Sequence, residues 1–288
     1  MLRDARAGDE AVIEAFLSNH AETSMFLRSN LRQYGLFDQD HDHAHATQFW
    51  LAETGGVVSA VFGLSNAGFA MSQAPDADPA LWAAFAAALS GRQLAGITGE
   101  AGQVTAAKRA FGLERADYAL DDPEPLYTLA LDALAIPDGD SVLRPPGEAD
   151  RPLLERWHAA YVTELRMSTP ARVASEARAR AARAISADST RLLESDGAPV
   201  AMTAFNARLP DMVQIGGVYT PPDLRGRGYA RRAVGLHLAE ARRAGVKTAI
   251  LFASGPAACR AYESIGFLRI GRYALAILKE PVTIGGVP

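Results

Sequence analysis

The sequence predicts an α/β chain with two similar domains, and three observations support this prediction. The chain has 288 residues, which is enough for two domains of about 100–200 residues each. Strand-like and helix-like patterns alternate through both halves. Short groups of residues also recur in the same order at a fixed spacing, as a duplicated domain would leave them.

The repeat relates the start of the chain to its middle. Five residues recur at an offset of 141 positions: Leu2, Arg3, Leu51, Glu53 and Gly56 correspond to Leu143, Arg144, Leu192, Glu194 and Gly197. Two weaker echoes follow, 111–113 with 265–267 and 118–119 with 273–274. An Ile-Pro-Asp-Gly-Asp stretch at 136–140 is typical of a linker. We therefore predict domains at residues 1–138 and 139–288.

The C-terminal half predicts the order β-α-α-β-β-β-α-β-α-β, from periodicity and from the glycine and proline positions. The ranges are 141–144, 150–166, 171–185, 191–195, 200–207, 211–220, 229–244, 248–253, 257–265 and 273–279. The N-terminal half gives helices at 9–19, 25–34, 79–89 and 104–111, and strands at 48–53, 57–64, 94–99 and 126–131. The two halves thus have similar element orders.

Composition and charge exclude several classes of protein. The formal net charge of −4 offers no basic field for nucleic acid. The longest apolar stretch, at 81–89, is far too short to cross a bilayer, and the charged N-terminus is unlike a signal peptide. The single cysteine, Cys259, forms no internal disulfide, which favours a cytoplasmic protein. We read this cysteine as a small helix residue rather than a nucleophile, because no histidine lies close to it in sequence.

The stretch most informative about chemistry is Val218-Tyr-Thr-Pro-Pro-Asp-Leu-Arg-Gly-Arg-Gly-Tyr-Ala230. A strand pattern ends there, two prolines stop it, and a loop rich in glycine and arginine opens a helix. A helix N-terminus offers unpaired N–H groups and a partial positive charge, and glycine lets that backbone approach a ligand closely. With Arg225 and Arg227 beside it, the loop predicts a pyrophosphate site.

Two other nucleotide motifs fit this loop poorly. Gly226 and Gly228 begin a dinucleotide fingerprint, but its third glycine position holds Arg231. That fingerprint also belongs to the first βα turn of a domain, whereas this loop follows a fourth strand. A P-loop is excluded because the Gly-Lys-Ser/Thr sequence is missing. A plain strand-to-helix turn with solvated arginines remains the alternative.

These residues carry a resemblance to the GNAT superfamily of acyl-CoA N-acyltransferases. Arg225-Gly-Arg-Gly-Tyr-Ala230 resembles the acyl-CoA motif, and Ala258, Tyr262, Gly266 and Phe267 resemble the helix after the fifth strand. Val218-Tyr-Thr-Pro-Pro, with Leu251-Phe252 and Ile265-Gly266-Phe267, is similar to the FR47-like branch. The motifs cover about residues 213–270. The resemblance implies two GNAT-like domains, each a mixed, mostly antiparallel, twisted sheet with flanking helices.

The resemblance also assigns binding roles. The fourth strand splays from the fifth, the pantetheine arm of the acyl-CoA enters the gap, and the backbone at Val218 and Thr220 bonds it. Gly216-Gly217 can supply the bulge that splays the strand; relief of crowding is the other interpretation. The predicted cofactor-binding residues are Val218, Tyr219, Thr220, Arg225, Gly226, Arg227, Gly228, Tyr229, Ala230 and Arg231.

Tyr262 matches the position that the family uses as a general acid. A phenol has a reference pKa of about 10, above about 8.5 for a thiol, so it is protonated at neutral pH and can donate to the departing CoA thiolate. A buried aromatic residue is the other interpretation. One departure from the family is Gly255, which stands where relatives carry an asparagine that holds the cofactor arm. Ser254 is a possible substitute.

No general base is evident. The predicted fourth strand offers Gln214 and Tyr219, while Glu164 and Glu194 are more typical of solvated surface charges. His237 on the motif helix is expected to be structural, and a water chain is an alternative base. His41, His43 and His45 suggest a metal, but they lack a fourth ligand nearby, and a solvated loop is the better interpretation.

The N-terminal half lacks the motif. Its counterpart of the loop, residues 74–80, has no glycine or arginine and carries Asp76 and Asp78, which cap a helix but repel a pyrophosphate. Lys108 stands at the counterpart of Tyr262. We expect this half to keep the fold without the cofactor and to wall off the acceptor pocket.

The predicted function is transfer of an acyl group, usually acetyl, from acetyl-CoA or another acyl-CoA to a primary amine of a small molecule. A protein or peptide amine is an alternative acceptor, and a non-catalytic acyl-CoA-binding module is an alternative class. No metal, nucleic acid or membrane is expected, and the chain is expected to be a monomer or homodimer.

Overall fold

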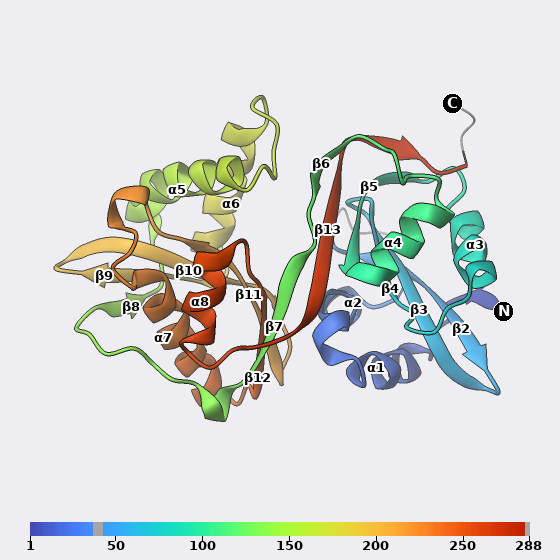
Figure 1. Cartoon of the computed structure of the whole chain (residues 1–288), viewed down its shortest axis with the longest axis horizontal. Coiled ribbons are helices and arrows are strands. Elements are labelled where there is room, and N and C mark those ends of the chain that lie inside the picture. The colour runs from blue at the N-terminus through green and yellow to red at the C-terminus, as the bar shows by residue number, and fades with distance from the viewer. Residues whose placement is uncertain (37–42, 286–288) are drawn as a thin grey trace. The chain divides into compact units, whose positions relative to one another are not determined.

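The structure is a computed structural model of the chain, and it describes residues 1–36 and 43–285. The chain divides into two compact units (Figure 1). Unit 1 comprises Met1–Pro123 together with Arg272–Pro288, and unit 2 comprises Glu124–Gly271.

Unit 1 is a sheet with two pairs of helices. The sheet order is β1-β2-β3-β4-β5-β13, with β6 also paired to β13. Its strands are β1 (Leu2–Asp4), β2 (Thr47–Thr54), β3 (Val57–Ser65), β4 (Phe69–Gln73), β5 (Gln93–Glu100), β6 (Tyr118–Asp121) and the larger part of β13 (Leu268–Thr283). Its helices are α1 (Glu10–Ser18), α2 (Ala21–Tyr34), α3 (Pro79–Ala88) and α4 (Ala101–Ala110).

Unit 2 repeats this plan. The sheet order is β8-β9-β10-β11-β12-β7. Its strands are β7 (Glu124–Ala130), β8 (Val142–Arg144), β9 (Thr190–Ser195), β10 (Ala198–Arg208), β11 (Met212–Tyr219) and β12 (Thr248–Phe252). Its helices are α5 (Arg151–Glu164), α6 (Val173–Ser186), α7 (Tyr229–Arg243) and α8 (Pro256–Glu263), with short 3₁₀ turns at Leu131–Ala133, Glu148–Asp150 and Pro222–Leu224.

Side-chain alternation along the strands buries both faces of each sheet. In unit 1, Phe49 and Leu51 pack with α1 and α2, whereas their neighbours Trp50 and Ala52 pack with α3 and α4. In unit 2, α5 and α6 cover one face, and α7 and α8 cover the other. This period of two is the pattern expected for strands between helix layers. The mixed, mostly antiparallel architecture confirms the predicted fold class.

The last strands of the two halves are exchanged. Strand β7, which precedes residue 138, pairs antiparallel with β12 in unit 2. Strand β13 from the end of the chain pairs with β5 and β6 in unit 1. The compact units therefore differ from the predicted boundary at residue 138. Their limits depend on long-range strand pairing, which leaves no local signal in the sequence.

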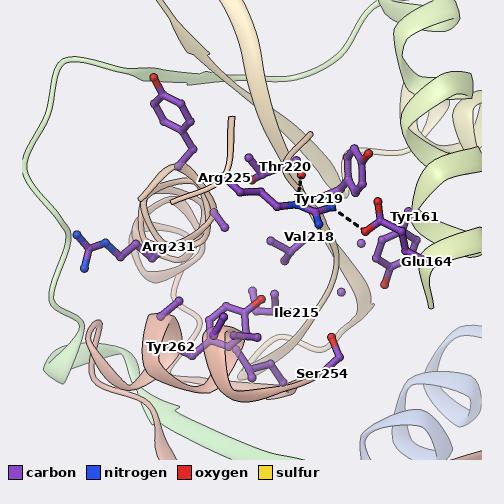
Figure 2. Close-up of a pocket in the computed structure, with 18 of the residues that line it drawn as sticks. Tyr161, Glu164, Ile215, Val218, Tyr219, Thr220, Arg225, Arg231, Ser254 and Tyr262 are labelled. Carbon is purple, nitrogen blue, oxygen red and sulfur yellow. Dashed lines mark hydrogen bonds and ion pairs between the residues drawn. The ribbon is translucent and has the colours of Figure 1, made fainter. Parts of the chain in front are cut away.

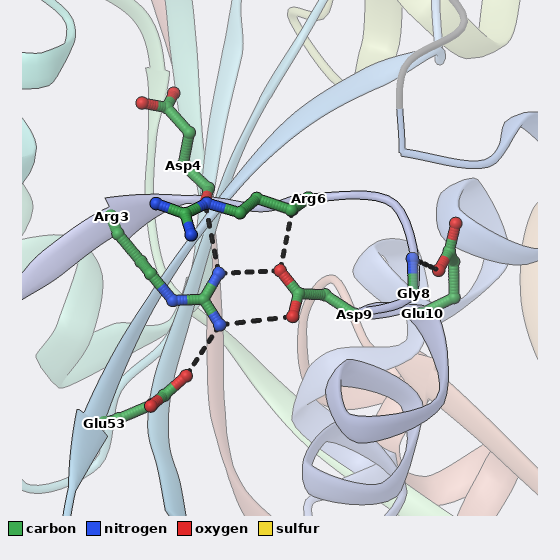
Figure 3. Close-up of polar contacts among 7 residues, drawn as sticks. All are labelled: Arg3, Asp4, Arg6, Gly8, Asp9, Glu10 and Glu53. Carbon is green, nitrogen blue, oxygen red and sulfur yellow. Dashed lines mark hydrogen bonds and ion pairs between the residues drawn. The ribbon is translucent and has the colours of Figure 1, made fainter. Parts of the chain in front are cut away.

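A duplicated ion cluster supports the predicted repeat. In unit 1, Arg3 bonds both carboxylate oxygens of Asp9, at 2.7 and 3.1 Å, and Glu53 at 2.6 Å (Figure 3). In unit 2, Arg144 bonds Asp150 at 2.7 and 2.9 Å and Glu194 at 2.8 Å. Each of the three residues has its counterpart 141 positions later. The repeated residues thus form the same structural cluster, which ties the first strand to the second strand and to the following helix.

The predicted elements lie within a few residues of the observed ones, with three omissions in unit 1. Strands β1, β4 (Phe-Ala-Met-Ser-Gln) and β6 escaped prediction. Strand β1 is only three residues long. Strand β4 is buried on nearly all sides, so it shows no alternation of polar and apolar residues. Strand β6 is only four residues long.

Candidate active site

The candidate site begins where two parallel strands of unit 2 separate. Strands β11 and β12 pair from Met212↔Thr248 to Ile215↔Leu251. Beyond Ile215, β11 continues to Tyr219 without a partner in β12. Backbone groups of these last residues that face the gap are therefore open to a ligand. The predicted splay of the fourth and fifth strands is present.

A bulge produces this separation. The β10–β11 register shifts between Met202↔Tyr219 and Ala204↔Gly216, which inserts an extra residue into β11. Gly217 has φ of +58°, a left-handed conformation that most side chains avoid. A Cβ atom on Gly216 would lie 1.8 Å from the Asn206 side chain. The bulge therefore requires glycine at position 217, whereas the glycine at position 216 relieves crowding against the Asn206 side chain.

The loop after β11 leads into a helix with an open N-terminus. A 3₁₀ turn at Pro222–Leu224 precedes Gly226 and Gly228, which have φ of +79° and +82°. Gly228 is the N-cap of α7, and no side chain bonds the first N–H groups of this helix. Helix α8 likewise starts at Gly255, φ +88°, without a side-chain cap. Two uncapped helix N-termini therefore lie at the carboxyl ends of β11 and β12, where an anion is favoured.

A cavity of about 740 Å³ occupies this region of unit 2. Nine of the ten predicted cofactor-binding residues line it, and so do Ser254 and Tyr262. The tenth, Arg227, lines an adjacent hollow together with Gly228, Tyr229 and Arg231. Thr220 also lines the cavity, and its Oγ1 is buried without a hydrogen-bond partner among the described residues.

The three arginines of the loop are placed differently. Arg225 donates to the Thr220 carbonyl at 2.9 Å and to Glu164 at 2.7 Å, so its guanidinium joins the loop to the end of α5 (Figure 2). Arg227 donates to the Asp223 carbonyl at 3.2 Å. Arg231 is exposed in the first turn of α7 and lines both hollows. The exposed guanidinium of Arg231 is therefore better placed to contact a ligand phosphate than the guanidinium of Arg225 is.

Tyr262 lies on α8 and lines the cavity beside Ile215 (Figure 2). The residue is only 8% exposed, and its ring packs edge-on against Phe267. Burial, with smaller contributions from Tyr161 and Glu124, raises the pKa of the phenol above its ordinary value. The hydroxyl therefore stays protonated at neutral pH and can donate a proton.

Two further cavity residues were missed by sequence reasoning. Glu124, the first residue of β7, lines the cavity although the sequence places it in the first half. Tyr161 of α5 lines it as well, and burial raises the pKa of its phenol. The signal for Tyr161 was its place one turn before Glu164 on a predicted helix; Glu124 gave no local signal.

The side chains that the sequence offers as a general base lie in different surroundings. Glu164 lines the cavity but is paired with Arg225. Glu194 belongs to the Arg144 cluster instead. Gln214 is buried and donates to the Ile215 carbonyl. His237 stacks on Phe205, and burial lowers its pKa to about 3, so it is neutral and structural as expected.

In unit 1, the chain's own side chains bond the N–H groups at the corresponding strand ends, beside a smaller cavity of about 430 Å³. Asp78 caps α3 by accepting the Leu81 N–H at 2.8 Å, and Glu100 caps α4 by accepting the Gln103 N–H at 3.0 Å. Gln103 in turn accepts the N–H of Ala74, just after β4, at 2.7 Å. Lys108 forms an ion pair with Asp121. These contacts use the donors that a pyrophosphate would need.

No group of three or more His, Cys, Asp or Glu residues in 1–36 and 43–285 is arranged to hold a metal ion. His43 and His45 lie within this part, while His41 lies outside the described residues. No helix in the same ranges has the length and apolar character needed to span a membrane.

The family model of the acetyltransferase (GNAT) family matches residues 154–267, which include β11, the glycine loop and Tyr262. Residues 154–267 form a GNAT acetyltransferase domain. The chain is therefore an acyltransferase, and the family to which this domain belongs uses acetyl-CoA as co-substrate. No curated protein matches the chain in sequence. The assignment to an FR47-like branch stays a prediction.

Solved structures share the fold over both units. A Drosophila protein is 13% identical, with a TM-score of 0.61, over 96% of this chain and 98% of its own. A GCN5-related N-acetyltransferase from Kribbella flavida is 18% identical, with a TM-score of 0.55, over 95% and 97%. A tandem GNAT protein from the clavulanic acid biosynthesis pathway is 18% identical, with a TM-score of 0.53, over 100% and 99%. The GNAT domain thus lies in a chain with the fold of a tandem GNAT protein.

Proposed function

We propose that the chain transfers an acetyl group from acetyl-CoA to a primary amine of a small molecule, at the cavity of unit 2. The observation that carries the proposal is the end of β11 that separates from β12. The cavity at this end is also lined by residues at the N-termini of α7 and α8, which have no side-chain cap, and by the protonated Tyr262. An acyl-CoA presents a pyrophosphate, an amide-rich arm and a thioester. The cavity offers a complement to each part.

The residues fit such a ligand as follows. The N–H groups of the loop and of the first turn of α7, at Gly226–Arg231, would bind the pyrophosphate, with Arg231 adding charge. The open backbone at Val218 and Thr220 would bond the pantetheine arm, with the Thr220 hydroxyl close by. Ser254 lines the same cavity and offers a hydroxyl one residue before Gly255, which stands where relatives carry an asparagine.

The chemistry is direct attack of the amine on the thioester carbonyl. The carbon–sulfur bond breaks, and Tyr262 donates its proton to the departing thiolate. The backbone N–H of Val218 would polarise the carbonyl and stabilise the negative charge that develops on its oxygen. Burial raises the pKa of the Tyr262 phenol, so the hydroxyl keeps its proton at neutral pH and the proton is available when the thiolate departs.

Thermal unfolding with acetyl-CoA, CoA and NAD in parallel tests the cofactor site. A ligand present at 100 times its Kd stabilises the folded state by about 2.7 kcal/mol, which raises the unfolding midpoint by several degrees. We expect both CoA compounds to raise the midpoint, NAD to have no effect, and Gly228→Glu to abolish the shift. No shift with either CoA compound contradicts the proposal.

Turnover of an amine panel separates an enzyme from a non-catalytic module. Binding of acetyl-CoA without acetylation of any amine favours the module, for which Gly255 in place of asparagine is the supporting observation. Acetylation of peptides in preference to small amines favours a protein acceptor. The single cysteine suits a reducing compartment, and we place the reaction in the cytoplasm.

A further inference from the structure

Unit 1 keeps a gap between β4 and β5, the strands that correspond to β11 and β12 in the sheet order. The two strands run parallel and pair from Phe69↔Gly96 to Met71↔Thr98. Beyond Met71, β4 continues to Gln73 without a partner in β5. A cavity of about 430 Å³ lies at this end of the strands. Its volume is within the range of about 300–1,000 Å³ that is typical of small-molecule sites.

Two buried glutamines line this cavity, and their hydrogen bonds fix the direction of both amides. The side-chain oxygen of Gln73 accepts from the hydroxyls of Thr23, at 2.7 Å, and Ser24, at 3.1 Å. The side-chain oxygen of Gln103 accepts the Ala74 N–H at 2.7 Å. Because both oxygens are held by donors, each glutamine turns its NH₂ group away from these partners.

The two NH₂ groups are unused donors of the cavity. Neither amide nitrogen has a hydrogen-bond partner among residues 1–36 and 43–285. Gln73 is 2% exposed and Gln103 is 8% exposed, yet neither nitrogen is a completely enclosed atom. The small accessible surface of each therefore lies at the cavity that both side chains line. Buried N–H groups without a partner are costly, so these groups favour a ligand with an acceptor oxygen.

Glu100 and Trp82 add an acceptor and an aromatic wall to the same cavity. One carboxylate oxygen of Glu100 caps α4 by accepting the Gln103 N–H at 3.0 Å, and the other has no hydrogen-bond partner among the described residues. Glu100 is also the only charged side chain among the described residues that line the cavity. Trp82 is 5% exposed, and its ring is held edge-on against Phe62.

This arrangement discriminates between ligands by charge and by hydrogen bonds. An anion is disfavoured, because it would lie near the carboxylate of Glu100. An organic cation with N–H groups is disfavoured too, because it carries only donors and would face the two glutamine NH₂ groups. A carboxamide carries both kinds of group, since its oxygen can accept from the glutamines and its N–H can donate to Glu100. An aromatic ring attached to it would pack beside Trp82.

We propose that the cavity of unit 1 binds a small, uncharged carboxamide that carries an aromatic ring. The NH₂ groups of Gln73 and Gln103 recognise the carbonyl oxygen of this ligand, and Glu100 recognises its N–H group. This site lies within unit 1 and does not depend on the acyl transfer proposed above. Unit 1 thus carries a binding site of its own, although it lacks the acyl-CoA motif.

Three molecules of nearly the same shape test this discrimination. At neutral pH benzamide is uncharged, benzoate is an anion and benzamidine is a cation. Saturation-transfer NMR titrations of the full chain give a Kd for each. We expect benzamide to bind at least about tenfold more tightly than either ion, because only benzamide satisfies both the glutamines and Glu100. Saturating acetyl-CoA should not displace benzamide, because acetyl-CoA is expected in the cavity of unit 2.

Gln103→Glu is the sharpest variant. It keeps an oxygen for the Ala74 N–H and replaces the NH₂ group by a second oxygen. Benzamide should then bind about two- to tenfold more weakly or worse, and benzamidine should become the preferred ligand. Gln33→Glu is the matched control, because it makes the same change of charge at an exposed position of α2 outside the cavity. It should keep the preference of the wild-type chain.

A second variant fills the cavity without changing its polar contacts. Ala106→Leu adds apolar atoms to the cavity wall and should abolish benzamide binding while the chain still unfolds cooperatively. Ala87→Leu makes the same change at an exposed position of α3 and should bind benzamide as wild type does. If Gln103→Glu fails to fold, this second pair of variants decides.

Four results would overturn the inference. They are no binding of benzamide, equal binding of the three molecules, displacement of benzamide by acetyl-CoA, and full benzamide binding in Ala106→Leu. A folded Gln103→Glu chain that keeps the wild-type preference would also overturn it. An absence of acetyl-CoA binding by the wild-type chain contradicts only the proposed function, because the benzamide site is separate.

Discussion

The two units begin equivalent helices in opposite ways. In unit 1, the N-caps of α3 and α4 are Asp78 and Glu100, and each carboxylate accepts an N–H of the first turn. In unit 2, the N-caps of α7 and α8 are Gly228 and Gly255, and neither helix has a side-chain cap. One sheet edge therefore presents filled anion sites, and the other presents open ones.

The two units thus share one fold but differ in what occupies their helix N-termini. Unit 1 retains the strand order, the helix layers and the ion cluster at its first strand. Its side chains now provide the negative charge that a phosphate would otherwise bring. Because capping also stabilises a helix, by about 1 kcal/mol for each cap, replacing a ligand by a carboxylate favours the folded state of unit 1.

The largest effect is expected where the two units differ in chemistry, at Tyr262 and its counterpart Lys108. Tyr262→Phe removes the proton donor and should lower kcat by about 10²–10⁴-fold, with acetyl-CoA affinity unchanged. Lys108→Met breaks an ion pair with Asp121 in unit 1 and should leave turnover near wild type. Steady-state kinetics with the best amine, together with thermal shifts, compare the two variants. Equal losses in both would contradict the assignment.

The pH dependence of wild-type activity is a second test of the role of Tyr262. The pKa of Tyr262 is raised above its ordinary value by burial, so the active, protonated phenol persists to higher pH than a free tyrosine. Activity should therefore show no loss from Tyr262 up to about pH 10, the ordinary pKa of a phenol. A kcat that declines from about pH 8 in the wild type but not in Tyr262→Phe would contradict this.

Converting one kind of cap into the other is the next test. Gly228→Asp gives α7 the carboxylate that Asp78 gives α3. Placing like charges together costs several kcal/mol, so acetyl-CoA binding should weaken by about 100-fold or more. Gly228→Asn is the control, because asparagine tolerates the left-handed conformation and adds no charge. Calorimetric titration should give a much smaller loss for asparagine; equal losses would assign the effect to backbone geometry.

A smaller loss of stability, similar in both units, is expected at the ion cluster that the two units share. Arg3→Met and Arg144→Met each remove a guanidinium bonded to two carboxylates. Hydrogen bonds to charged groups contribute about 1.5–3 kcal/mol, and the partial exposure of these clusters places the expected loss at the lower end. Chemical denaturation at neutral pH measures it. Losses that differ strongly would show that the repeated cluster no longer has one role.

Acid unfolding gives the sign of this contribution. Hydrogen bonds from Arg3 and Arg144 lower the pKa values of Asp9 and Asp150. A carboxylate whose pKa is lower in the folded state stabilises the protein above its unfolded pKa of about 3.9 and loses this contribution as pH falls further. Both arginine variants should therefore be less stable than wild type at neutral pH, by about the same margin. Their stability should approach that of wild type near pH 2–3.

The smallest expected effect is at the cap of α3. Asp78→Ala removes the acceptor of the Leu81 N–H and should lower the stability of the chain by about 1 kcal/mol without creating an acyl-CoA site. Binding is not restored because Glu100 and Gln103 still fill the strand edge. Thermal unfolding with and without acetyl-CoA checks both parts. An increase in acetyl-CoA affinity would show that one carboxylate is enough to silence the site.

Much of the candidate site was predictable because its signals are local. The two prolines, the glycines and the arginines between Val218 and Arg231 stand within fourteen residues and fix a strand end, a loop and a helix start. Tyr262 was predictable from its position on α8, the helix that follows α7 in the same half of the chain. Arg225 was only half predicted: it belongs to the loop, but its guanidinium turns to Glu164, 61 residues away, instead of to an open phosphate site.

The sequence by itself determined the duplicated order of elements, the glycine loop and the place of Tyr262 on the following helix, because each depends on residues close together in the chain. Only the tertiary structure decided which strand completes which sheet, since β7 pairs with β12 and β13 with β5 across more than a hundred residues. That pairing brings Glu124 to the cavity. Strand pairing is satisfied by any partner of suitable register and burial, so the exchange leaves no mark in the local pattern.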